Sequence, residues 1–138
     1  MPPTLDRIDH IHVFVADRAA AERWYQQVLG LERVAALAIW ADEPGGPLII
    51  ADSTGAICLS LFERAPVKCR STIALSVSGH QFCQWQDWLS QALPSPPRLE
   101  DHRLAWSLYF SDLDGNPFEI TTYDRDIPTM GDCIAQGG

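Results

Sequence analysis

A carboxylate stands in a segment whose other residues favour a β-strand. Glu119 follows the turn-forming run Asp114-Gly115-Asn116-Pro117 and lies among aromatic and β-branched residues at 118–123. Two histidines, His10 and His12, alternate with aliphatic residues in a second such segment near the N-terminus. Carboxylate and imidazole groups transfer protons in many active sites, and both bind divalent metals. The sequence therefore carries groups for acid–base chemistry or metal binding, and its elements must position them.

Two similar halves of the chain are predicted to do so. Asp17 can cap the helix of the first half and Gly30 can end it, and Asp52-Ser53-Thr54-Gly55 has hairpin chemistry. The first half is expected to contain strands at 8–15, 32–40, 48–51 and 56–62, a helix at 17–30 and a loop at 41–47. The second half is expected to contain strands at 72–78, 104–110 and 118–123 and a helix at 80–93. A further strand before 104 is left open.

The halves align as an internal repeat. AICLSLFER at 56–64 lies on PFEITTYDR at 117–125 with an offset of 61, and HIHVFV at 10–15 lies on TIALSV at 72–77 with an offset of 62. Such similar offsets indicate two copies of one supersecondary unit, each with the order β-α-β-β-β. In this superposition Glu119 falls on Cys58, and His10 falls on Thr72.

Side chains alternate along each strand, which sorts the strands into two faces. One face is almost wholly aliphatic or aromatic and is expected to pack against the two helices. The other is mixed, and its three aromatic residues favour the wall of a small-molecule cavity over a solvated surface. The mixed face comprises His10, His12, Phe14, Cys58, Ser60, Phe62, Thr72, Ala74, Ser76, Glu119, Thr121 and Tyr123.

The chain resembles the vicinal oxygen chelate superfamily, which includes glyoxalases, extradiol dioxygenases and the fosfomycin and bleomycin resistance proteins. The opening residues of the resemblance are Asp9-His10, Asp17, Trp24-Tyr25 and Val28-Leu29-Gly30-Leu31, and the closing ones are Phe110 to Ile120. The likeness covers about residues 5–125 and implies an α+β fold. In that fold two tandem βαβββ modules, here 5–66 and 70–125 of a single domain 1–138, form a curved mixed sheet around a cup-shaped site. Residues 126–138 are expected to form a loosely held tail.

The resemblance also implies a divalent metal, Zn, Fe, Ni or Mn, with ligand positions at His10, Cys58, Thr72 and Glu119. Metal-dependent members have a histidine where Thr72 stands, and a protein usually offers at least three ligands. Cys58 is the better third candidate, because a strand advances about 6–7 Å over the two residues from His10 to His12. His10 can instead be a buried histidine hydrogen-bonded within the cup, with Glu119 as a candidate partner, and Cys58 a small buried residue.

Other candidate residues have alternative interpretations. Trp40 and Trp106 can be walls of a ligand site or plain core, with about equal weight, and His12 is expected to line the pocket. The ligand-binding set is predicted as His12, Phe14, Trp40, Ser60, Phe62, Thr72, Trp106, Thr121 and Tyr123. Three tryptophans at helical spacing, Trp24, Trp85 and Trp88, are expected in the core, and His80 and His102 on the surface.

Three functions compete. The first is a protein that binds a small amphipathic molecule, with an atypical or absent metal site. The alternative is a metal-dependent lyase, isomerase or dioxygenase with His10 and Glu119 as ligands or catalytic groups; an enzyme is slightly favoured. Acid–base catalysis by these two residues without a metal is a third reading.

Composition limits the partners. A net charge of −8 repels phosphate backbones and anionic lipids, so neither nucleic acid nor membrane is an expected partner. The N-terminal sequence MPPTLDRIDH lacks the pattern of a secretory signal, and no apolar run approaches the length of a membrane span. The four cysteines, at 58, 69, 83 and 133, are expected to be reduced thiols in a cytoplasmic protein, with a disulfide as the less favoured alternative. A homodimer is implied by the family resemblance.

Overall fold

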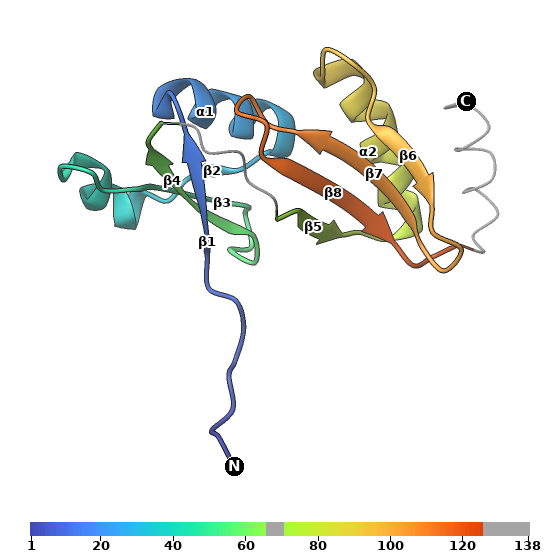
Figure 1. The fold of residues 1–138 in the computed structure, drawn as a ribbon, viewed down its shortest axis with the longest axis horizontal. Coiled ribbons are helices and arrows are strands. Elements are labelled where there is room, and N and C mark those ends of the chain that lie inside the picture. The colour runs from blue at the N-terminus through green and yellow to red at the C-terminus, as the bar shows by residue number, and fades with distance from the viewer. Residues whose placement is uncertain (66–70, 126–138) are drawn as a thin grey trace. The chain divides into compact units, whose positions relative to one another are not determined.

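The computed structural model describes residues 1–65 and 71–125, which form two compact units, Met1–Val67 and Lys68–Gly138. Each unit folds as one β-α-β-β-β module with its own four-stranded mixed sheet (Figure 1). The predicted α+β class and the two tandem modules are therefore confirmed. The predicted tail at 126–138 lies outside the described residues.

In unit 1 the strand order is β1-β4-β3-β2, with β1 parallel to β4 and the other pairs antiparallel. The apolar side of this sheet is buried: Val15, Leu61 and Ile50 are 0% exposed. The elements are β1 (Ile11–Val15), α1 (Arg18–Trp24), η1 (Tyr25–Leu29), β2 (Glu32–Arg33), η2 (Ala35–Asp42), β3 (Leu48–Ala51) and β4 (Cys58–Glu63).

The predicted first helix begins and ends as expected but winds differently in its second half. The Asp17 carboxylate accepts a hydrogen bond from Ala20 N at 3.0 Å, and Gly30 ends the helix with a φ of 70°. From Tyr25 to Leu29 the chain is a π-helix, whose wider turn changes which side chain faces the sheet. Tyr25 is consequently buried, whereas Trp24, which was expected in the core, is half-buried.

The predicted strand at 32–40 is wrong beyond its first two residues. Only Glu32–Arg33 forms a strand, and Ala35–Asp42 is a 3₁₀ helix, η2. This segment contains four alanines, which are depleted in strands, and its apolar residues do not alternate with polar ones. The change matters because η2 carries Trp40. Of the predicted loop at 41–47, the first two residues therefore belong to η2, which ends at Asp42, and the loop begins at Glu43.

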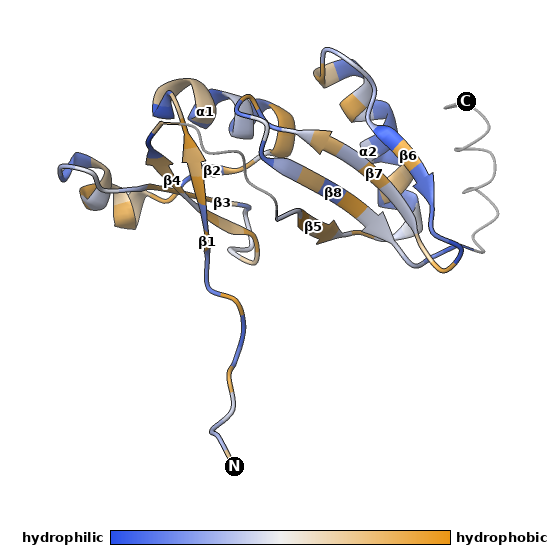
Figure 2. Cartoon of the chain, viewed as in Figure 1, coloured by the Kyte–Doolittle hydropathy of each residue, from blue (hydrophilic) through white to orange (hydrophobic). Residues whose placement is uncertain are grey.

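In unit 2 the order is β5-β8-β7-β6, again with the outer first strand parallel to its neighbour. A capping box of Ser78 and Gln81 starts the helix. The strand that was left open exists as β6, a short edge strand that Figure 2 shows to be strongly hydrophilic. The elements are β5 (Ile73–Ser76), α2 (Gly79–Ala92), β6 (Arg98–Asp101), β7 (Trp106–Ser111) and β8 (Pro117–Thr122).

The helix α2 packs with the stripe that contains Phe82 and Leu89, both 0% exposed. Gln86 is buried between them in the helical repeat. Trp88 was expected in the core but is 46% exposed, because its position faces away from the buried stripe. Trp85 is half-buried.

The predicted division of each sheet into two faces is confirmed. Phe118, Ile120 and Thr122 on β8 are buried, and the intervening Glu119 and Thr121 are half-buried. Strands β1 and β4 alternate in the same way, except that Ser60 on the mixed face is only 2% exposed. Apart from Ser60, the residues of the mixed face on these strands are therefore more exposed than their neighbours on the apolar face.

The oxidation state of the cysteines and the absence of a membrane span were both predicted, and both can be compared with the described residues. Cys58 is a free thiol, whereas Cys83 is disulfide-bonded, so the expectation of reduced thiols is wrong for Cys83. Sequence spacing does not reveal which cysteines a fold brings together. Cys69 and Cys133 lie outside the described residues. None of the described helices is both long and apolar enough to cross a membrane.

Candidate functional site

A pocket of about 300 Å³ lies on the mixed face of unit 1. Its floor comes from β1, β3 and β4, and η2 supplies one wall. Most of its surface is apolar, with imidazole, thiol, hydroxyl and carboxylate groups at a few points. It is lined by Asp9, His10, His12, Leu37, Trp40, Pro47, Ile49, Cys58, Ser60 and Phe62. Trp40 and five other residues predicted to bind a ligand or a metal thus line the same pocket: His10, His12, Cys58, Ser60 and Phe62.

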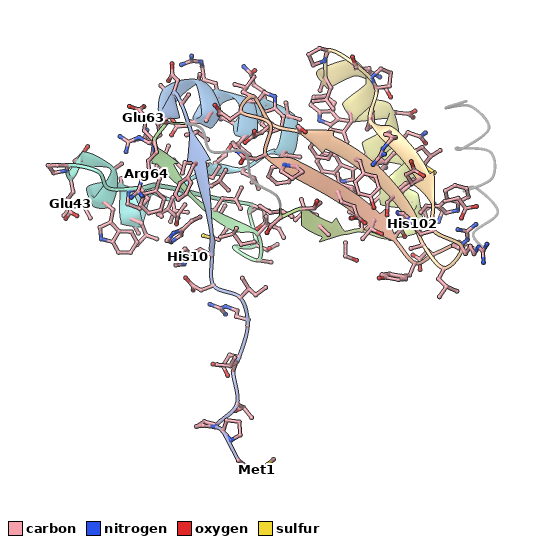
Figure 3. All side chains as sticks on the ribbon, in the orientation of Figure 1. Met1, His10, Glu43, Glu63, Arg64 and His102 are labelled. Atoms are coloured by element: carbon pink, nitrogen blue, oxygen red, sulfur yellow. The ribbon has the colours of Figure 1, made fainter. Side chains whose placement is uncertain are left out.

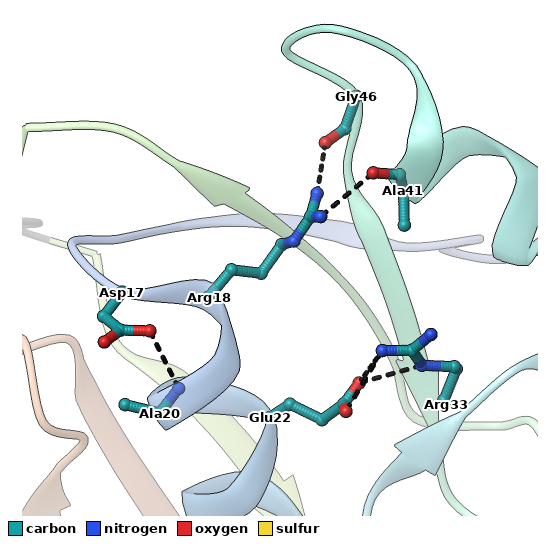
Figure 4. A network of polar contacts seen from close by, with 7 residues as sticks. All are labelled: Asp17, Arg18, Ala20, Glu22, Arg33, Ala41 and Gly46. Atoms are coloured by element: carbon teal, nitrogen blue, oxygen red, sulfur yellow. Dashed lines mark hydrogen bonds and ion pairs between the residues drawn. The ribbon is translucent and has the colours of Figure 1, made fainter.

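The Trp40 wall is held by an arginine from α1. Arg18 donates from Nη1 to the carbonyl of Gly46 and from Nη2 to the carbonyl of Ala41, both at 2.9 Å (Figure 4). Gly46 is needed where it stands, because a Cβ there would lie 1.9 Å from the Trp40 carbonyl oxygen. These contacts hold the backbone that follows Trp40, which is 43% exposed. No local sequence pattern predicts this clamp.

Two histidines converge at the edge of the pocket, where the extended N-terminal segment joins β1 (Figure 3 labels His10). Their Nε2 atoms are 3.1 Å apart, and the rings stack with centroids 5.1 Å apart. The expectation that a two-residue advance would keep His12 away from His10 is wrong: His10 precedes β1, and its ring stacks on the ring of His12. Asp9 Oδ2 lies 2.8 Å from His10 Nδ1 and fixes the orientation of that ring.

The pocket also contains the thiol of Cys58 and the aromatic ring of Phe62. Burial raises the pKa of the Cys58 thiol, and the charge of Asp9 raises it further. Phe62 packs against His12 with ring centroids 4.7 Å apart and meets the edge of Phe14 at 6.1 Å. The Arg64 guanidinium covers both phenylalanine rings, 5.2 Å from one centroid and 5.1 Å from the other. Phe14 therefore supports the pocket from beside Phe62.

Glu119 lies on the mixed face of unit 2, within a hydrogen-bonded group. Ser107 Oγ donates to Glu119 Oε2 at 2.8 Å and lies 3.1 Å from Thr121 Oγ1. Tyr109 stands opposite Glu119 in the β7–β8 ladder. Burial, followed by the Glu119 charge, raises the pKa of the Tyr109 phenol. His102, which is exposed as expected, has its Nε2 atom 2.8 Å from Tyr109 Oη.

Sequence reasoning missed Ser107 and Tyr109. Both belong to β7, and they alternate there with Leu108 and Phe110, so sorting this strand by faces would have placed them beside Glu119. Ser107 is 0% exposed, which makes it the buried polar partner that a carboxylate in a sheet requires.

The internal repeat is offset by two residues between the modules. Ile11 pairs with Leu59 in unit 1, whereas Ile73 pairs with Phe118 in unit 2, two residues before the equivalent predicted from the sequence. Glu119 consequently lies opposite Ala74, and Thr72 precedes β5 and is exposed. A shift of two residues keeps every side chain on its own face, so hydrophobic alternation could not reveal it.

The other predicted residues of unit 2 have structural partners. The Arg125 guanidinium lies over the Trp106 ring at 4.5 Å, donates to the Ala105 carbonyl and pairs with Asp101. Trp106 is therefore part of the packing at this end of the sheet. Tyr123 follows β8 and is 73% exposed.

The residues that the family resemblance implied as metal ligands are divided between the two units. His10 and Cys58 belong to unit 1, and Thr72 and Glu119 belong to unit 2. Within residues 1–65 and 71–125 no three His, Cys, Asp or Glu side chains cluster closely enough to hold a metal ion. His10 and His12 do lie together, with their Nε2 atoms 3.1 Å apart.

The chain belongs to the Glyoxalase/Bleomycin resistance protein/Dioxygenase superfamily, whose family model matches residues 7–120. This agrees with the two βαβββ modules and confirms the resemblance that the sequence motifs indicated.

Solved structures share the fold. A Glu-to-Gln variant of the fosfomycin resistance protein FosX from Listeria monocytogenes, complexed with Mn(II) and 1S,2S-dihydroxypropylphosphonic acid, matches with a TM-score of 0.68 and 15% identity over 86% of this chain and 93% of that one. An integron cassette protein from the mobile metagenome of Halifax Harbour sewage outfall matches with a TM-score of 0.68 and 19% identity over 86% and 99%. The virulence protein STM3117 from Salmonella typhimurium matches with a TM-score of 0.57 and 24% identity over 88% and 99%. At these identities the likeness concerns the fold.

Proposed function

We propose that the protein binds a small amphipathic organic molecule and that the unit 1 pocket forms a principal part of its binding surface. The observation that carries this proposal is the combination of an indole, a phenyl ring and aliphatic residues with two imidazoles at one edge. A concave, mainly apolar surface with a few polar groups is the usual form of a small-molecule site. In this proposal Trp40 and Phe62 contact the apolar part of the ligand, and His12 and Ser60 contact its polar part.

The charge of the protein favours a cationic ligand. The chain has a net charge of −8, and Asp9 contributes a carboxylate at the edge of the pocket. Field focusing by such a surface raises the local concentration of cations. The protein acts as a homodimer in the cytoplasm.

Binding to chelator-treated protein tests the proposal. A panel of aromatic cations is titrated calorimetrically into protein dialysed against EDTA, and the tightest binder is then measured with Trp40→Phe. We expect the dissociation constant to rise about 10-fold, because the indole provides a large part of the apolar wall. Trp88→Phe is the matched control, since Trp88 is similarly exposed but lies on α2. Absence of binding without metal, or equal effects of the two substitutions, would count against the proposal.

A metal-dependent lyase, isomerase or dioxygenase is the second candidate. It is favoured by the FosX structure solved with Mn(II), a protein of the same fold. In this case His10 and Glu119 hold the metal, Cys58 serves as a third ligand, and the metal polarises oxygen atoms of the substrate. Glu119→Gln should then abolish both metal content and turnover, and unchanged metal occupancy in this variant would exclude the candidate.

A further inference from the structure

The hydroxyl of Ser60 stands free in the floor of the unit 1 pocket. Ser60 is 2% exposed and is flanked in the sheet by His12 on β1 and Ile49 on β3, which line the same pocket. Within residues 1–65 and 71–125 its hydroxyl makes no hydrogen bond, although every side-chain oxygen or nitrogen that is fully sealed there has a partner. The Ser60 oxygen is therefore open to the pocket rather than sealed in the core.

A molecule that fills the pocket must replace the water at this hydroxyl. A serine hydroxyl can donate one hydrogen bond and accept two, and a buried hydroxyl left without a partner is unfavourable. Since the Ser60 oxygen is reached through the pocket, the ligand itself must provide a partner once it has displaced the water. A ligand with a hydrogen-bonding group at this point is therefore favoured over an analogue that lacks the group.

The surroundings of Ser60 favour an uncharged group there. Cys58 lies two residues away on the same face of β4, and burial, followed by the charge of Asp9, raises the pKa of its thiol, so the thiol is neutral at pH 7. The imidazole of His12, opposite Ser60, is already engaged by His10 through its Nε2 atom. The residues that line the pocket include no lysine or arginine. Burial of a charge without an opposite charge is strongly unfavourable, so an anionic group at the Ser60 end is disfavoured.

The carboxylate of the pocket lies toward the other end. Asp9 precedes His12, the residue opposite Ser60, by three residues, which separates the two by at most about 10 Å of chain. The pocket volume of about 300 Å³ corresponds to about ten water molecules at about 30 Å³ each. One aromatic ring with a short amine arm suits both this volume and this separation.

We propose that the ligand of the unit 1 pocket is an arylalkylamine whose ring carries an uncharged hydrogen-bonding group, such as a hydroxyl, at the end that meets Ser60. Trp40 and Phe62 contact the ring, and the amine lies toward Asp9. Ser60 is then the residue that determines specificity for the uncharged group. This inference rests on the proposed function, because it names the class of molecule that the same pocket takes.

Three matched amines test the inference, each titrated into the full-length protein in EDTA and followed in proton–nitrogen NMR spectra. Tyramine carries a ring hydroxyl, phenethylamine lacks it, and 4-(2-aminoethyl)benzoate has a carboxylate in its place. We expect tyramine to bind about 10-fold more tightly than phenethylamine, and the benzoate at least about 10-fold more weakly than phenethylamine. In Ser60→Ala the preference for tyramine should fall below about twofold. Cys58→Ala is the matched control on the same face of β4 and should keep the preference.

The stability of the free protein provides a second readout, for which no ligand is needed. Because the Ser60 hydroxyl makes no hydrogen bond within the described residues, Ser60→Ala should unfold at a urea concentration no lower than the unsubstituted protein does. A lower midpoint would show that the hydroxyl holds the fold and would overturn the inference. A preference for tyramine that survives in Ser60→Ala would overturn it too.

Failure of this inference is distinguishable from failure of the proposed function. If aromatic cations bind in the pocket but tyramine does not, or binds no more tightly than phenethylamine, the inference is wrong and the proposed function stands. If none of the aromatic cations binds, both are wrong.

Discussion

Removing the Arg18 side chain should loosen η2 and with it the Trp40 wall. The guanidinium donates one hydrogen bond to the Gly46 carbonyl and one to the Ala41 carbonyl, both at 2.9 Å, from a half-buried position. A hydrogen bond to a charged group contributes about 1.5–3 kcal/mol, and the partial exposure of Arg18 favours the lower value, so the pair contributes about 3 kcal/mol. Arg18→Met keeps the aliphatic stem and a good helix former at the start of α1.

Amide hydrogen exchange measures this loss locally. Gly46 N donates to the Glu43 carbonyl, and Glu43 N donates to the Trp40 carbonyl. If these amides exchange through opening of η2, a loss of about 3 kcal/mol accelerates them about 100-fold, since 1.4 kcal/mol is a factor of ten. Amides of β7 and β8 should keep their exchange rates in Arg18→Met.

A neighbouring arginine provides the matched control. Arg33 pairs with Glu22 of α1 (Figure 4), with an N–O distance of 2.9 Å and half of the Arg33 side chain exposed. Exposed pairs of this kind contribute little, so Arg33→Met should change the exchange of Glu43 and Gly46 less than about fivefold. Equal protection in Arg18→Met and in the unsubstituted protein, or equal effects of the two substitutions, would refute the clamp.

Three further substitutions test the local structure. Gly46→Ala should lower the free energy of unfolding in urea by about 1–3 kcal/mol, because its Cβ would meet the Trp40 carbonyl oxygen; an unchanged midpoint would contradict this close approach. Phe82→Ala should cost about 3–5 kcal/mol in the same assay, since Phe82 is 0% exposed, and a loss below 1 kcal/mol would contradict its place in the core. Asp52 has a lowered pKa because its carboxylate accepts hydrogen bonds from Ile57 N and Thr54 Oγ1, so it stabilises the fold above the unfolded pKa of about 3.9 and this stability is lost as pH falls through the folded pKa. Asp52→Asn should therefore be less stable than the unsubstituted protein at pH 7 and nearly equal to it once the pH lies below the folded pKa of Asp52, and a deficit that persists there would refute this reasoning.

Much of the fold follows from local signals in the sequence. Asp17 and Gly30 mark the ends of the first helix, the run 52–55 marks a hairpin, and period-two alternation assigns Glu119 and its neighbours to the correct face. These features depend on residues that are adjacent in the chain or one turn apart. Their physical causes are therefore visible in short stretches of sequence.

The parts that were missed depend on contacts between distant segments. The two-residue difference in register preserves the pattern of faces, so only the strand pairs themselves reveal it. The clamp from Arg18 joins α1 to the segment after η2, and the Ser107–Glu119 hydrogen bond joins two strands. The convergence of His10 on His12 depends on the backbone leaving β1 at that point, which alternation does not predict.

The Trp40 indole N–H signal in a proton–nitrogen NMR spectrum tests the central claim most directly. The tightest ligand from the screen is added to EDTA-treated protein, and the signals of the five tryptophans are followed. Binding in the unit 1 pocket should shift the Trp40 signal and the backbone signals of His12, Ser60 and Phe62, and leave Trp88 unchanged. Binding that shifts only signals of unit 2, or that appears only after metal is restored, would contradict the account.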